Sequence, residues 1–184
     1  PVIVHVIHFG QLVATYPNID SNQIYSQIQV LNADFNLNAA GRSNLPSQFA
    51  NVEANTGVKF CMAKQNPQGT PLVERGIDRV SAVTNAWTNP ANMTNLKAYF
   101  TGTIIPATIW DPSKYFNIWV SDKPTTVTYN GFATYPTGTG LVGLIGGTIG
   151  SATNDGIWIY AKNFGTVGTV SSPFDKGRTA THEV

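Results

Sequence analysis

The segment that most constrains the fold is the first one, residues 2–9. It reads Val-Ile-Val-His-Val-Ile-His-Phe, which is rich in β-branched residues and almost wholly apolar. Apolar residues on both sides of a strand are typical of a sheet covered on both faces, because a half-exposed strand alternates apolar and polar residues. The segment therefore predicts a buried strand in a layered fold.

A helix that lies on this sheet is predicted soon afterwards. Asp20 is followed three positions later by Gln23, which resembles a capping box with Asp in place of Ser or Thr. Apolar residues then recur at helical spacing: Ile24, Ile28, Leu31 and Phe35. This pattern predicts an amphipathic helix of about 14 residues.

Further extended segments follow along the chain. Strands are predicted at residues 58–63, 76–80, 116–120, 129–136 and 156–160. Because strands and helix are interspersed, the sequence predicts an α/β fold with a mixed sheet and a backing helix. With 184 residues, 42% of them hydrophobic, we expect residues 1–184 to form a single domain.

Three residues of metal-binding type occur in the predicted strands. His5 and His8 lie three positions apart, so their side chains project to opposite sides of a strand and do not readily chelate one ion. We expect both to be structural. The single cysteine, Cys61, cannot form an internal disulfide, and we expect it to be a small buried residue in its apolar segment.

The charge and composition exclude some classes of function. Charged residues make up only 11% of the chain and the net charge is +1, without a Lys/Arg run, so the basic surface of a nucleic-acid-binding protein is missing. No apolar run is long enough to span a membrane. The low charge suits a secreted or surface protein. Because the chain opens at Pro1, inside a predicted strand, we expect that an N-terminal segment has been removed.

A formal G-x-G-x-x-G pattern lies at residues 138–143. A dinucleotide-binding fingerprint needs a helix that opens on the glycines, yet more glycines follow at Gly146, Gly147 and Gly150. We therefore interpret this stretch as a surface loop, and one beside a cleft could shape access to it.

The chain ends in Gly-Arg-Thr-Ala-Thr-His-Glu-Val, and His182-Glu183 is half of a zinc-peptidase motif. Pro173 and Gly177 indicate a loop, and the threonines that follow are candidate helix-start residues, so a helix is predicted to begin between Arg178 and Thr181. In the complete H-E-x-x-H motif, a second histidine lies one helical turn after the first. The alternative is an ordinary surface His and Glu at a chain end.

Taken in order, these segments resemble the pappalysin family of metzincin zinc metallopeptidases, and especially its secreted bacterial and fungal members. The similar segments span most of the chain: residues 1–8, 27–35, 45–49, 60–63, 117–120, 131–136, 155–156, 164–166 and 177–183. The resemblance implies the N-terminal part of a catalytic domain, with a twisted mixed sheet, a backing helix and an active-site helix that begins near residue 178.

On this resemblance the protein is a secreted zinc endopeptidase, with His182 as a zinc ligand and Glu183 as the general base. The resemblance implies that the other zinc ligands lie beyond Val184. Structural Ca²⁺ is compatible with this family resemblance. The partners would be a peptide substrate and the C-terminal remainder of the same protein. Because catalytic zinc sites use three protein ligands, we expect this chain alone to be inactive. The substrate would pair with an edge strand, implied to be residues 156–160. Where many relatives carry a cysteine this chain has Ser121, which puts a disulfide to Cys61 in doubt.

A different class of function is also compatible with the sequence. Low charge, many Thr and Asn residues, and the aromatic Trp87, Trp110 and Trp158 are typical of extracellular modules that bind glycans or surface polymers without catalysis. Tryptophans buried in a core explain the same composition equally well.

Overall fold

A five-stranded mixed sheet forms the centre of the computed structural model, which describes residues 1–39, 41–135 and 149–184. Across the sheet the order is β2-β1-β3-β5-β4. β1 pairs in parallel with β2 and β3, β3 pairs in parallel with β5, and β4 is antiparallel to β5. The strands are β1 (Val2–His8), β2 (Ile77–Ser81), β3 (Phe116–Ser121), β4 (Gly131–Ala133) and β5 (Ile157–Tyr160). The predicted α/β fold is confirmed.

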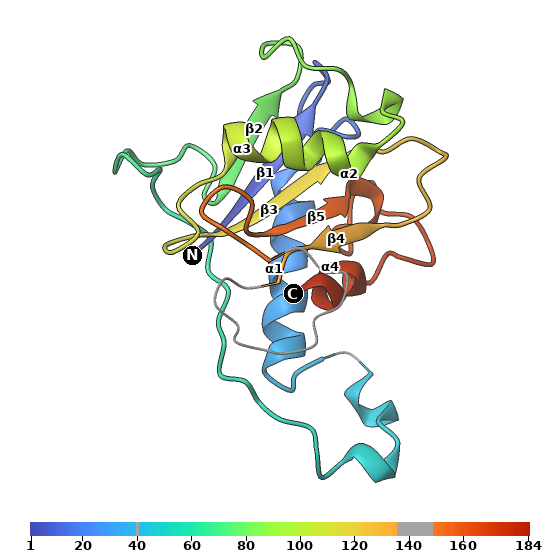
Figure 1. Ribbon diagram of the computed structural model, residues 1–184. Helices are drawn as coiled ribbons and strands as arrows, with labels where there is room; N and C mark the ends of the chain where they lie inside the picture. Colours follow the sequence, from blue (N-terminus) through green and yellow to red (C-terminus); the bar gives the residue numbers. More distant parts are fainter. Residues whose placement is uncertain (40, 136–148) are drawn as a thin grey trace.

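Both faces of the sheet are covered, as the first strand predicts. Alternate side chains of β1 enter two different cores: Val4 packs in the core beneath the helix α1 (Ser21–Phe35), and Ile7 packs in the core on the opposite face. In Figure 1, α1 passes behind the sheet and α2 and α3 lie in front of it. The second cover is a nearly continuous helical stretch of α2 (Leu96–Tyr99), a π-helical turn (Phe100–Ile104) and α3 (Ile105–Thr108).

The remaining helices are short. The 3₁₀ turns are Arg42–Asn44, Ser47–Phe49, Pro90–Asn92 and Ala161–Asn163. The last helix, α4 (Arg178–Glu183), lies beside α1 and near the edge strand β4 (Figure 1). Among the helices of the described residues, none is long and apolar enough to cross a membrane.

Several predictions of local structure are wrong or incomplete. Residues 58–63 are not a strand, and only Met62 forms an isolated bridge, to Val2. Cys61 is exposed rather than buried, because its segment runs along the end of β1 instead of entering the sheet. Of the predicted strand 129–136, residues 129–135 are described, and among these only Gly131–Ala133 pairs in the sheet. The glycine pattern at residues 138–143 lies outside the described residues.

Candidate functional site

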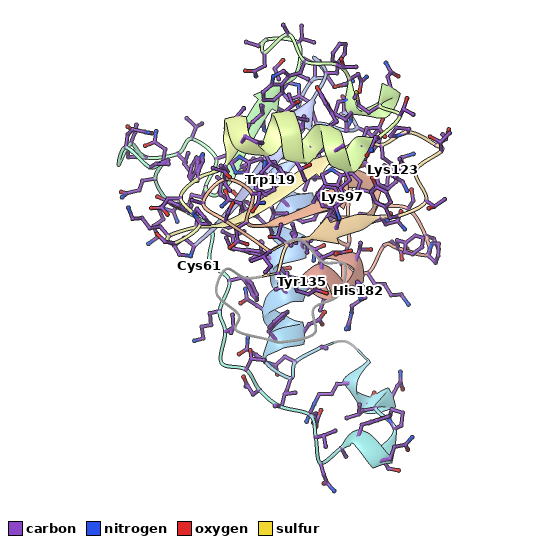
Figure 2. The ribbon with its side chains drawn as sticks, viewed as in Figure 1. Cys61, Lys97, Trp119, Lys123, Tyr135 and His182 are labelled. Atoms are coloured by element: carbon purple, nitrogen blue, oxygen red, sulfur yellow. The ribbon has the colours of Figure 1, made fainter. Side chains whose placement is uncertain are left out.

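The candidate site is a cleft of about 420 Å³ between α4 and the edge strand β4. His182 and Glu183 line it from the helix, Gly131 from the strand, and Tyr129 and Phe174 from the adjoining loops. The His182 side chain is exposed and makes no hydrogen bond within the described part of the chain. Figure 2 shows His182 on α4, below β4 in that view. The two residues of the predicted half-motif therefore lie together at an accessible cleft.

The carboxylate of Glu183 lies directly against the backbone of the edge strand. A Cβ atom built on Gly131 would come within 2.6 Å of Glu183 Oε1 and 2.8 Å of its Cγ. The absence of a side chain at Gly131 therefore allows the glutamate to lie there. Burial raises the pKa of Glu183, and the nearby side chains of His182 and Lys97 act in the opposite direction.

Lys97 is a charged residue near this cleft that the sequence analysis does not identify. It belongs to α2, and its Nζ lies 5.7 Å from the ring centroid of Phe132, on β4. Figure 2 shows Lys97 on the other side of β4 from His182. Because it comes from the helix that covers the front of the sheet, only the tertiary fold brings it near Glu183.

α4 is held in place by polar groups on the backing helix α1. The buried Gln27 donates from Nε2 to the carbonyl of Gly177, at 2.9 Å, immediately before α4 begins. Thr181 Oγ1 donates to Asp34 Oδ2 at 2.6 Å, and Arg178 forms an ion pair with the same carboxylate at 3.2 Å. The helix begins at Arg178, as predicted, but its N-cap is Gly177 in the left-handed conformation, without a side-chain cap.

Gln23 and Gln27 also bind the segment that leads to α4. Gln23 donates from Nε2 to the carbonyls of Ala161 and Phe164 and accepts from the Thr169 amide, while Gln27 Oε1 accepts from the Gly165 amide. The N-cap of α1 is Asp20, which accepts from the Gln23 amide at 2.7 Å. The predicted capping box is therefore only half correct, because the Gln23 side chain binds the distant segment instead.

The N-terminal histidines do not join the site. His5 is fully buried, stacks on Trp119 with a centroid distance of 5.3 Å, and bonds to Asp78 and Asn117. His8 contacts the Gly10 amide, and burial lowers its pKa. Among the described residues, no three His, Cys, Asp or Glu side chains form a group that could hold a metal. The structural role expected for His5 agrees with these contacts.

Among the described residues, the outermost strand at this end of the sheet is β4, not residues 156–160. β5 lies between β3 and β4, with partners on both sides, so it has no free edge. The substrate-binding edge implied by the resemblance is therefore wrong, because residues 156–160 are an inner strand. One sequence signal could have identified β4: glycine inside a strand often marks a close approach of another group, and Gly131 is such a residue. The glutamine and aspartate contacts of α1 have no comparable signal.

The fold matches that of metzincin-type metallopeptidases. The matching structures are of mirolysin: mature mirolysin of Tannerella forsythia in complex with a cleaved peptide has a TM-score of 0.77 and 33% sequence identity, and the match covers 100% of this chain and 60% of that one. Mirolysin in complex with compound 9 has a TM-score of 0.76 and 34% sequence identity, and the match covers 100% of this chain and 60% of that one. A Tannerella forsythia promirolysin point mutant has a TM-score of 0.74 and 34% sequence identity, and the match covers 100% of this chain and 52% of that one.

The chain thus spans about 60% of the length of mature mirolysin. No protein-family model matches the sequence, and the comparison with curated proteins gives no match.

Proposed function

We propose that this chain belongs to a secreted zinc endopeptidase, in which His182 is a zinc ligand and Glu183 is the general base. The observation that carries the proposal is the cleft at α4, where both residues lie beside an open strand edge. The similarity to mirolysin, whose mature form has been solved with a cleaved peptide, supports a peptidase function in general.

Zinc fits the site only in part. The His182 imidazole is exposed at the cleft and suits a single zinc–nitrogen bond. A catalytic zinc site needs three protein ligands, and the described residues contain no such group. The residues outside the described ranges, 40 and 136–148, include no His, Cys, Asp or Glu in the sequence either. The resemblance implies that the other ligands lie in a C-terminal remainder of the protein, which we propose as its partner.

The chain's own contribution to the chemistry would come mainly from Glu183. Zinc, when bound, lowers the pKa of a bound water to about 7 and polarises a carbonyl group. The Glu183 carboxylate would accept a proton from the attacking water and pass it to the leaving amine nitrogen. The space above Gly131 lets it lie next to the strand edge, where the scissile bond would lie.

The edge strand β4 would orient the substrate. An open strand edge offers unpaired backbone N–H and C=O groups, and an extended peptide can pair with them. Because β4 has only three residues and α4 lies beside it, a peptide paired there would run past Glu183. We therefore propose β4 as the substrate-binding edge.

Three further assignments belong to the same proposal. Residues 1–184 would form the N-terminal part of a peptidase catalytic domain, and the narrower family would be the pappalysins. The protein would act outside the cell, with peptides or proteins as substrates. The low charged fraction of 11% supports an extracellular location.

The test uses the protein together with its C-terminal remainder and a panel of quenched fluorescent peptides. We expect zinc-dependent cleavage that a chelator abolishes and added zinc restores. Replacing Glu183 by Gln should lower kcat/KM by about 10²- to 10⁴-fold, as expected for loss of a general base, with zinc content unchanged. His182→Ala should lose zinc, measured by elemental analysis.

Asn92→Gln provides the control, since Asn92 is exposed and distant in sequence from the cleft residues. It should retain full activity. Undiminished hydrolysis by Glu183→Gln would rule out the proposed role of Glu183, and peptide cleavage that does not depend on zinc would rule out the metallopeptidase assignment.

A further inference from the structure

A second cleft, of about 770 Å³, lies at the opposite edge of the sheet from β4. Its wall is formed by residues 78–81 of β2, loops at residues 66–72 and 84–87, and the end of α3 with the residues that follow it. This volume lies within the range of small-molecule sites, about 300–1,000 Å³. None of its lining residues lines the α4 cleft, so it is a separate feature of the molecule.

The four tryptophans of the chain divide into two pairs by location. Trp119 and Trp158 are fully buried, and their indole N–H groups donate to Thr108 Oγ1 and Ser121 Oγ, respectively. Trp87 and Trp110 are partly exposed and both line the second cleft. Within the described part of the chain, neither of these two indole N–H groups has a hydrogen-bond acceptor. The fold therefore satisfies the indole N–H groups of the core pair internally and leaves those of the cleft pair available to a ligand.

A carboxylate is fixed in the wall of the same cleft. Asp78 Oδ2 bonds to His5 Nδ1 at 2.8 Å, while His5 Nε2 contacts Asn117 Oδ1 at 3.1 Å. The Asn117 side-chain amide is itself held by the backbone of Trp110: its oxygen accepts from the Trp110 N–H and its nitrogen donates to the Trp110 carbonyl, each at 2.9 Å. The buried His5 thus connects Asp78 to the segment that carries Trp110. The second oxygen of Asp78 has no partner among the described residues and remains an acceptor.

The charges around the cleft select against an anionic ligand. The carboxylates in its lining are Asp78 and Asp111. The only cation among the described lining residues is Arg79, whose guanidinium is engaged by Glu74, Asn18 and the carbonyl of Ile19. Exposed amides add neutral donors and acceptors: Gln68 and Asn85 line the same cleft. A ligand rich in hydroxyl groups, with apolar ring faces and no negative charge, complements this set.

We propose that the cleft at β2 binds a neutral oligosaccharide. The apolar face of a sugar ring would pack on Trp87 or Trp110, and its hydroxyl groups would donate to Asp78 and exchange hydrogen bonds with Gln68 and Asn85. This site is independent of the peptidase proposal: it would anchor the molecule to a glycan, whatever the cleft at α4 does.

An extended peptide is the competing occupant, because β2 is also an edge strand. Peptide pairing along β2 would use backbone groups and would not require the two indole N–H groups. The tryptophan pair and the fixed carboxylate therefore favour the saccharide, and the two ligands give different results in one experiment.

The experiment is an NMR titration of the ¹⁵N-labelled 184-residue chain, observing the four indole N–H signals. The probes are neutral tetrasaccharides of glucose, mannose and N-acetylglucosamine, a sulfated heparin tetrasaccharide, and an extended heptapeptide. We expect saturable shifts of the Trp87 and Trp110 signals with at least one neutral saccharide, unchanged Trp119 and Trp158 signals, and no binding of heparin. Trp87→Ala should weaken binding about tenfold or more.

Gln68→Ala, a change in an exposed loop side chain, should weaken binding by a smaller factor, and it tests the site even if Trp87→Ala disturbs the fold. Phe174→Ala, in the other cleft, is the matched control and should bind as well as the parent chain. The proposal is overturned if no neutral saccharide shifts the two signals, if Trp87→Ala and Gln68→Ala both bind with unchanged affinity, or if only the peptide binds, with backbone shifts along β2.

Discussion

At the scale of single residues, one glycine defines the geometry of the candidate site. Gly131 lies in an ordinary strand, where an alanine would fit the backbone without strain. Its importance comes instead from the space above it, which the Glu183 carboxylate fills. The atoms that a Cβ would displace belong to the flexible end of a side chain, so the fold can accommodate the change while the carboxylate cannot keep its position.

We therefore expect Gly131→Ala to separate activity from stability. The free energy of unfolding should change by less than about 1 kcal/mol. In the protein with its C-terminal remainder, kcat/KM for peptide hydrolysis should fall by about tenfold or more, because each 1.4 kcal/mol of lost transition-state stabilisation costs about that factor. Urea unfolding and peptide kinetics measure the two effects.

Gly102→Ala is the comparison for this variant, since a Cβ at Gly102 meets nothing within 4 Å. Its kcat/KM should equal that of the parent protein. Equal activity of the Gly131→Ala protein and the Gly102→Ala protein would show that the contact with Gly131 does not position Glu183.

At the scale of elements, α1 is more than an apolar cover for the sheet. Its inward face carries Ile24, Ile28 and Leu31, but also the buried Gln23 and Gln27. These two amides bind the backbone of residues 161–177, a segment with few backbone ladder bonds of its own. Because α4 has only six residues, it depends on these contacts and on Asp34 for its position.

Replacing Gln27 by Ala should therefore destabilise the chain by about 2–4 kcal/mol, since it leaves the Gly165 amide and the Gly177 carbonyl buried without their partner. Hydrogen exchange at Gly165 should become faster. Gln29→Ala, an exposed position on the same helix, should change the stability by less than about 0.5 kcal/mol. Similar losses in the two variants would contradict the role of Gln27.

At the scale of the whole molecule, Arg79 joins three parts of the chain. Its guanidinium donates to the Glu74 carboxylate, to Asn18 Oδ1 and to the carbonyl of Ile19. The hydrogen bond from Arg79 lowers the pKa of Glu74 from its usual value of 4.5, although partial burial acts in the opposite direction. A lowered folded-state pKa stabilises the fold above the unfolded value, and the stabilisation is lost as the pH falls through the folded value.

This linkage predicts a pH-dependent cost of Glu74→Gln. At pH 7 the free energy of unfolding of the variant should be about 0.5–1 kcal/mol lower than that of the parent chain. The effect is modest because the Glu74 side chain is 34% exposed and screened by solvent. As the pH falls below 4.5 and through the lowered folded-state pKa of Glu74, the difference should shrink and then disappear, since the parent carboxylate becomes protonated. Urea unfolding over a pH series from 7 downwards measures it, and a constant difference would exclude the linkage.

The two open edges of the sheet give the molecule two separate clefts, and the sequence reveals only one of them. The His182-Glu183 pair is adjacent in the chain, so a motif identifies it without knowledge of the fold. The second cleft combines Trp87, Trp110 and Asp78 from three segments. Their composition suggested a glycan-binding module, yet sequence alone could not distinguish these tryptophans from the buried Trp158.

The sequence by itself determined the elements whose pattern is local: β1 from its apolar run, α1 from its helical spacing, and the start of α4 from the turn residues before it. The sequence does not predict a helix at residues 96–108, because the α, π and α turns there, with Gly102 and Pro106, do not keep one helical period. Tertiary structure alone decided that β4 is the edge, that Cys61 is exposed and that Glu183 lies against Gly131. These facts depend on strand order and on contacts between residues far apart in the chain, which local periodicity does not encode.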